Sequence, residues 1–132
     1  MKLLNSYFNI IESTVTEDGL TGKFIVSLNG NHPVYEGHFP GEPVCPGVCS
    51  MQMVKECAAQ MCGKKLTFIY LKQYRLLSVM TPAVNGNIDI NIELTPTEKD
   101  GASIFKIKAA VCESDNIEQK YLDINGELAP AE

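Results

Sequence analysis

The chain has 132 residues, of which 45% are hydrophobic and 20% are charged, and its formal net charge at pH 7 is −5. This length and composition predict one folded globular domain, residues 1–132, and exclude a disordered chain. The negative net charge argues against nucleic acid as a partner, because binding to phosphates requires a concentrated basic surface.

The pattern of apolar residues and cysteines bears on where the protein works. No apolar stretch approaches the roughly 20 residues that span a bilayer, and the N-terminus turns polar at Asn5 and Ser6. We therefore expect no membrane span and a cytoplasmic location. Four of the five cysteines crowd into residues 45–62 without a Cys-x-x-Cys pair. An odd, clustered set favours small core residues in a reducing compartment over disulfides or a metal site.

The first predicted element is a β-hairpin. Residues 7–15 form an apolar stretch, and Phe24, Val26 and Leu28 then recur at every second position. Residues 17–19, Glu-Asp-Gly, stand between the two stretches and are typical of a turn.

A loop and a helix follow the hairpin. Residues 30–47 contain eight prolines and glycines, which disfavour regular structure. Residues 48–62 are largely apolar and contain neither residue type, and Gly63 stands at their end. This pattern predicts about four helical turns that end at the glycine. Apolar or small residues occupy nearly the whole circumference, so we expect a buried central helix.

After this helix the hydrophobic pattern has a period of two, which is typical of strands with one buried face. Residues 66–77 form one further predicted strand. The alternating positions fall in three segments: Ile88, Ile90, Ile92 and Leu94; Phe105, Ile107, Ala109 and Val111; Leu122, Ile124, Gly126 and Leu128. An antiparallel sheet of five to six strands wrapped around one long central helix satisfies both periods and gives an α+β domain. Because pairing two copies edge to edge covers long edge strands, we expect a dimer.

The clearest chemical signal is His38, in the proline-stiffened loop that leads into the predicted helix. The prolines lower the entropy cost of holding the imidazole in one place. A helix start offers unpaired amides and a partial positive charge, which suit a carbonyl that becomes an enolate. Histidine is the side chain best suited to remove a proton near neutral pH. Together these features indicate chemistry at the carbon beside a thioester carbonyl.

This segment resembles the signature of the bacterial 3-hydroxyacyl-carrier-protein dehydratases (the FabZ and FabA type), which have the hot-dog fold. Eight positions agree at fixed spacing: Gly37-His38-Phe39-Pro40, Pro43 and Pro46-Gly47-Val48. The resemblance implies that His38 removes the α-proton and that the amide of Gly47 binds the thioester carbonyl. It implies that Phe39 and Val48 line the acyl tunnel.

The activity that this resemblance implies is elimination of water from a 3-hydroxyacyl chain on acyl carrier protein, giving the trans-2-enoyl product. The pathway would be fatty-acid synthesis or a related acyl or polyene synthesis. The family builds each site at a dimer interface, and its reaction requires no cofactor or metal.

The chain departs from the family at the acid. The family has glutamate or aspartate fourteen residues after the histidine, where this chain has Gln52. An amide cannot protonate a departing hydroxyl, and the loss of a general acid costs on the order of 10²–10⁴ in rate. One turn later the family commonly has glutamine, where this chain has Glu56, so the two residue types look exchanged.

Three interpretations of this exchange stay open. In the first, Glu56 supplies the proton while Gln52 orients the hydroxyl or the carboxyl. In the second, Gln52, Lys55, Glu56 and Gln60 form only a polar stripe that faces water or a partner subunit, with Glu56 paired to Lys55. In the third, Gln52 serves binding alone.

The functions that follow are an active dehydratase, a catalytically impaired subunit, or an acyl thioesterase. The impaired subunit would bind acyl chains or complete a heteromeric dehydratase, in which it donates His38 and its partner donates the acid. A thioesterase also needs a carboxylate, and its loops match this sequence less well. Co-purification with a hot-dog protein that retains the acid distinguishes the first two functions.

A basic cluster adds a candidate docking surface for the acyl carrier protein. Lys64, Lys65, Lys72 and Arg75 lie within twelve residues of each other. Carrier proteins are acidic and their thioester arm carries a phosphate, so these cations are candidates for docking. The alternative is a solvated face without a partner.

Overall fold

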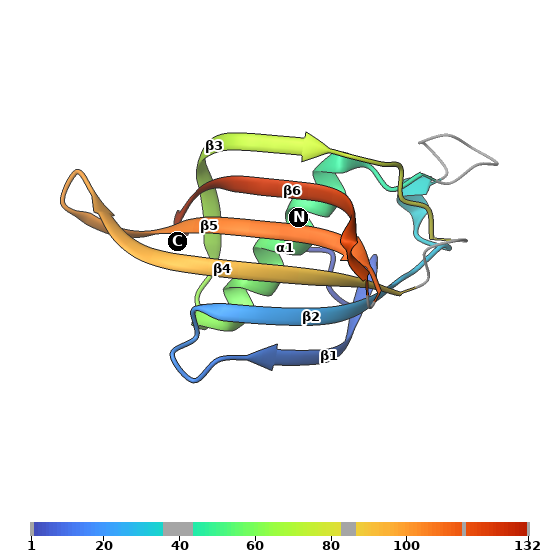
Figure 1. Cartoon of the computed structure of the whole chain (residues 1–132), viewed down its shortest axis with the longest axis horizontal. Helices are drawn as coiled ribbons and strands as arrows, with labels where there is room; N and C mark the ends of the chain where they lie inside the picture. The colour runs from blue at the N-terminus through green and yellow to red at the C-terminus, as the bar shows by residue number, and fades with distance from the viewer. Residues whose placement is uncertain (1, 36–43, 83–86, 115, 132) are drawn as a thin grey trace.

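Within the described residues, 2–35, 44–82, 87–114 and 116–131, the computed structural model has six strands in one sheet and one α-helix. The helix crosses behind the sheet, as Figure 1 shows. The elements are β1 (Phe8–Val15), β2 (Thr21–Leu28), the short 3-10 helix η1 (Pro33–Tyr35), α1 (Gly47–Cys62), β3 (Leu66–Leu76), β4 (Asn87–Lys99), β5 (Ala102–Glu113) and β6 (Asn116–Pro130).

The strands lie in the order β1-β2-β4-β5-β6-β3, and each pairs antiparallel with its neighbours. After α1 the chain forms β3 at the far edge of the sheet, beside the C-terminal strand β6 (Figure 1). The predicted hairpin is β1 and β2, and its turn places Gly19 at a φ of 74°, where glycine is favoured. This architecture confirms the predicted α+β arrangement of a sheet around one helix.

The predicted alternation places one face of the sheet against α1. Ile88, Ile90 and Ile92 are each at most 1% exposed, as are Ile107 and Leu122 on the neighbouring strands. Burial of each such side chain contributes roughly 1.5–3 kcal/mol of hydrophobic free energy. The sheet and the helix therefore share one core.

The predicted role of the cysteines as core residues is confirmed. All five thiols are free, and Cys45, Cys49, Cys57 and Cys112 are buried. Burial raises the pKa of each of these four thiols above its ordinary value. Among the described residues no helix is long and apolar enough to cross a membrane.

Helix α1 begins and ends close to the predicted positions, and within this chain one of its faces is fully buried. Gly63 adopts the left-handed conformation, with φ 68° and ψ 22°, and its amide donates to the carbonyl of Ala59 at 2.9 Å. The buried face consists of Cys49, Ser50, Met53, Val54, Cys57, Ala58 and Met61. The opposite face is half-exposed. Small residues such as Ala59 count as apolar in the sequence pattern, but they do not need to be buried against another element.

Candidate active site

The predicted base, His38, and the predicted tunnel residue Phe39 lie outside the described residues. The described structure does show where this segment starts and ends. Tyr35 and Cys45 are buried, and the Tyr35 hydroxyl lies 3.4 Å from the Cys45 sulfur. The two described residues that flank this segment therefore lie side by side in the core, directly before the start of α1.

The start of α1 at Gly47 has the features predicted for binding a carbonyl. Pro46 is the N-cap, with an extended backbone, and no described side chain caps the helix. The carbonyl of Pro46 accepts the amides of Cys49 at 3.0 Å and Ser50 at 3.2 Å. The amides of Gly47 and Val48 precede these bonds and point out of the helix end, where its partial positive charge favours an anion.

The two predicted substrate residues at this helix start lie differently with respect to the core. Gly47 is half-buried, whereas Val48 leaves 63% of its surface exposed. A valine this exposed is available to contact a ligand or a second chain. Its exposure is compatible with the predicted lining role but does not require it.

A residue that sequence reasoning missed, Tyr74 of β3, also reaches the helix start. Its hydroxyl occupies the space that a Cβ at position 47 would need, and its ring Cζ would lie 3.4 Å from that Cβ. Burial raises the pKa of the Tyr74 phenol, so the hydroxyl keeps its proton. The period-two pattern of residues 66–77 gave no signal for this contact, because it cannot say which helix residue a strand residue meets.

The carboxylate of Glu56 is bound by amides. Its Oε2 accepts the backbone N–H of Leu3 at 2.8 Å and the Nε2 of Gln52 at 2.9 Å. Its Oε1 accepts the backbone N–H of Leu4 at 2.9 Å. These bonds attach the N-terminal segment to α1 and hold the side chain of Gln52. The pairing of Glu56 with Lys55, which the polar-stripe interpretation includes, is thus replaced by these contacts.

A groove of about 790 Å³ follows this half-exposed face of α1. Gln52 and Glu56 line the part of the groove along the helix, and Lys64 and Lys65 line the part beyond the end of the helix. Over the eleven residues from Gln52 to Gly63 the helix rises about 16 Å. The groove therefore connects the exchanged pair of residues with a positively charged end.

The predicted docking cluster does not form one surface. Lys64 and Lys65 stand just before β3, whereas Arg75 is near the opposite end of this strand. At the rise of a β-strand, this separation is about 30 Å measured along the strand. Arg75 bonds both carboxylate oxygens of Asp123, at 3.0 Å and 2.5 Å. Lys72 lines a separate depression over β4, β5 and β6.

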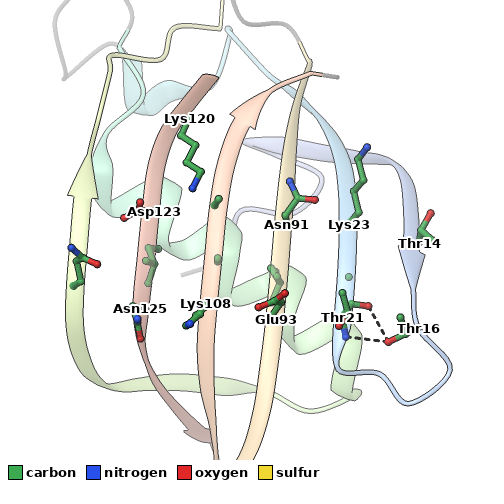
Figure 2. A pocket seen from close by; sticks show the side chains of 16 residues that line it. Thr14, Thr16, Thr21, Lys23, Asn91, Glu93, Lys108, Lys120, Asp123 and Asn125 are labelled. Atoms are coloured by element: carbon green, nitrogen blue, oxygen red, sulfur yellow. Dashed lines mark hydrogen bonds between the residues drawn. The ribbon is translucent and has the colours of Figure 1, made fainter. Parts of the chain in front are cut away.

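The outer face of the sheet carries a further polar depression of about 580 Å³. Figure 2 shows the side chains of Lys23, Asn91, Lys108, Lys120 and Asp123 on this face, with α1 behind the strands. None of the predicted site residues that the structure describes lines it. The described residues that were predicted for catalysis and substrate binding therefore lie at the helix start and along the groove of α1, whereas Lys72 and Arg75 lie elsewhere.

Comparisons with known proteins agree with the predicted family. The family described as ApeI-like, ApeI dehydratase, matches residues 13–117 of this chain. The 3-hydroxyacyl-acyl-carrier-protein dehydratase FabZ of Herpetosiphon aurantiacus is 27% identical over 84 residues, which are 58% of this chain and 60% of that protein. FabZ of a Ruegeria species is 27% identical over 107 residues, covering 75% of this chain and 66% of that protein. The chain thus spans less than two thirds of the Herpetosiphon protein.

Among solved structures, the dehydratase heterocomplex ApeI:P from Xenorhabdus doucetiae is similar to this chain, with a TM-score of 0.64 at 16% identity. The similarity covers 92% of this chain and 96% of that chain, which confirms the predicted hot-dog fold. The family match extends over well more than half of the sequence. The chain therefore belongs to the ApeI-like dehydratase family.

Proposed function

We propose that this protein removes water from a 3-hydroxyacyl thioester on acyl carrier protein and forms the trans-2-enoyl thioester. The observation that carries the proposal is the start of α1, where the amides of Gly47 and Val48 precede the first intrahelical bonds and no described side chain caps them. His38 stands nine residues before Gly47 in the sequence. Membership in a dehydratase family supports the same reaction.

In this proposal each residue has a defined task. The imidazole of His38 takes a proton from the carbon beside the thioester carbonyl. The carbonyl oxygen gains negative charge, which the Gly47 amide and the helix end stabilise. The bond between C3 and the hydroxyl oxygen then breaks, and the hydroxyl leaves as water after it receives a proton. Phe39 and Val48 would contact the acyl chain.

The source of that last proton decides between two forms of the proposal. In the first form Glu56 supplies it. The contacts of Glu56 favour the second form, because both of its oxygens accept N–H donors from Leu3, Leu4 and Gln52. A carboxylate used in this way has a structural task. In the second form a partner hot-dog subunit therefore supplies the acid, and this chain supplies His38.

One observation favours that heteromeric form, and a second favours pairing with another chain in general. The neighbour ApeI:P is itself named as a dehydratase heterocomplex. In addition, the edge strand β3 exposes apolar side chains, including Ile69 at 43%, Leu71 at 39% and Leu76 at 58%. We propose that this edge pairs with a second hot-dog chain, either a copy or a partner, because pairing covers free strand edges.

An exchange of the two residue types tests the assignment of the acid. The double variant Gln52→Glu/Glu56→Gln restores the family order at these positions. If a partner normally supplies the acid, this variant alone should gain dehydratase turnover by about 10²–10⁴-fold over the wild-type chain alone. If Glu56 is the acid, Glu56→Gln alone should abolish turnover by the isolated protein. Unchanged turnover in both variants would contradict both forms.

We further propose that the positively charged end of the groove docks the carrier protein and its phosphate. Lys2, Lys55, Lys64 and Lys65 line the groove, and Glu56 is the one carboxylate among its described lining residues. Lys64→Glu/Lys65→Glu should raise KM for a carrier-linked substrate more than for a short pantetheine thioester. Lys72→Glu, on the separate depression, is the matched comparison. An equal effect on both substrates would remove Lys64 and Lys65 from the docking role.

A further inference from the structure

Tyr74 is an unexplained polar group at the start of α1. It belongs to β3, where it is paired in register with the buried Ile124 of β6, and its ring packs against the core. Its hydroxyl stands at the position that a side chain on residue 47 would fill. Two elements far apart in the sequence thus bring the first residue of α1 and a phenol together.

The contacts of Tyr74 do not account for its hydroxyl. Among the described residues no hydrogen bond to this oxygen is found, and the oxygen is not one of the fully buried polar atoms, so solvent or a ligand can reach it. The ring alone fills the core equally well as phenylalanine, so packing does not explain the polar atom. By contrast the hydroxyl of Tyr35, a buried residue, has a partner in the Cys45 sulfur. The hydroxyl of Tyr74 is therefore available to a molecule bound at the helix start.

We propose that Tyr74 is a substrate-contacting residue of this site, whose hydroxyl donates a hydrogen bond to the thioester carbonyl oxygen beside the amide of Gly47. The inference rests on the proposed function, since it assumes that a thioester carbonyl binds at Gly47. It adds a side-chain donor to a site that the family signature describes by its backbone amide.

The chemistry of the phenol suits this task. A carbonyl that becomes an enolate needs donors that are fixed before the reaction and that keep their protons. Burial raises the pKa of Tyr74, so the phenol remains a donor at neutral pH. Placement on a strand that is paired along its length holds the ring in position without help from the loop that carries His38. Removing one donor of this kind typically costs about 10²–10³ in kcat.

The geometry also gives a reason for glycine at position 47. With the tyrosine hydroxyl in place, any larger residue at the helix start would displace the donor. The Gly47 and Tyr74 positions therefore act as one unit, in which the absence of a side chain on the helix makes room for the phenol of the strand. A strand residue that served only to fill the core would place no such demand on the helix.

The test compares Tyr74→Phe with Tyr70→Phe, the same change on the same strand at a residue that is 51% exposed. Dehydratase turnover is measured in the assembly in which the wild-type protein is active, alone or with its partner. Tyr74→Phe should lower kcat by about 10²–10³-fold with little change in KM, and Tyr70→Phe should retain wild-type kcat. Wild-type kcat in Tyr74→Phe would overturn the proposal.

A second readout keeps this inference separable from the dehydration reaction. A saturated acyl-pantetheine thioester with a 13C-labelled carbonyl is bound to each variant, and the carbonyl stretch is measured by infrared difference spectroscopy. The stretch should lie at higher frequency in Tyr74→Phe than in the wild type and Tyr70→Phe, because a donor has been lost. An identical stretch in all three proteins would overturn the contact. A shifted stretch without turnover by the wild type would retain Tyr74 and reject dehydration, and a wild type that binds no thioester would reject both.

Discussion

At the scale of single residues, the contact between Gly47 and Tyr74 makes a quantitative prediction about stability. Gly47→Ala places a methyl group against the tyrosine hydroxyl, and overpacking of this kind costs about 1–3 kcal/mol. In a Tyr74→Phe background the added methyl group meets the ring Cζ at 3.4 Å, which is ordinary contact. The cost should therefore largely disappear there, and urea unfolding of the four proteins measures the coupling energy.

The same four proteins can also give a result that contradicts this contact. If Gly47→Ala destabilises the protein equally with tyrosine and with phenylalanine at position 74, the two residues do not share the space as described. Additive effects are expected only for residues without contact. The result would then also remove the structural basis for placing the phenol at the helix start.

Glu56 gives a second prediction at this scale. Glu56→Ala leaves the amides of Leu3 and Leu4 without their acceptor, which should cost about 1–3 kcal/mol in unfolding free energy. Hydrogen exchange at these two amides should become faster, while exchange in β4 and β5 stays slow. Gln52→Ala is the control, because it removes one bond to the carboxylate and leaves both amide contacts intact. Unchanged hydrogen exchange at Leu3 and Leu4 would show that Glu56 does not hold the N-terminal segment on α1.

The sequence predicted part of this site and could not predict the rest. The resemblance to the dehydratase family identified Gln52 and Glu56 as an exchanged pair, and their spacing of four residues predicted that they share a helix face. The partners of Glu56 are the amides of Leu3 and Leu4, more than fifty residues away. Every residue except proline has the same backbone N–H, so the sequence cannot show which amides bind Glu56, and only the folded chain shows this contact.

At the scale of elements, α1 has two faces that differ in thiol reactivity. Cys57 lies on the buried face, and burial, with a smaller contribution from the nearby charge of Glu56, raises its pKa to about 12. Cys62 is half-exposed at the end of the helix. A thiol reagent at pH 8 should therefore modify Cys62 first in the native protein, because the thiolate is the reactive form.

Peptide mass mapping after timed labelling checks this order. All five cysteines should react once the protein is unfolded in denaturant, since the protection comes from burial. Native labelling of Cys57 as fast as that of Cys62 would show that the apolar face of α1 does not pack against the sheet as described.

Local sequence patterns predicted some of the elements but not their order in the sheet. Period-two alternation identified β4, β5 and β6, and Gly63 marked the end of α1, because both signals are local. The place of β3 at the edge beside β6 is set by pairing over about fifty residues, which no local pattern encodes. For the same reason the docking cluster seemed continuous in the sequence, although β3 carries Arg75 away from Lys64 and Lys65.

At the scale of the whole molecule, one face of α1 and the edge of β3 stay uncovered in a single chain. A protein with a net charge of −5 also gathers four lysines along the groove of α1. Uncovered apolar edges and a local reversal of charge are features of surfaces that meet other proteins. The dimer, the carrier protein and the cytoplasmic location stay predictions.

The central claim is that the chain takes part in removing water from a carrier-bound 3-hydroxyacyl thioester through His38. The most direct test incubates 3-hydroxyacyl carrier protein with the purified chain, alone and together with a hot-dog partner that retains the acid, and follows the intact carrier by mass spectrometry. The account predicts loss of one water molecule from the carrier-bound acyl chain, faster with the partner, and no loss above the partner-alone rate with His38→Ala. No loss of water in either arrangement, or equal loss with His38→Ala, would contradict it.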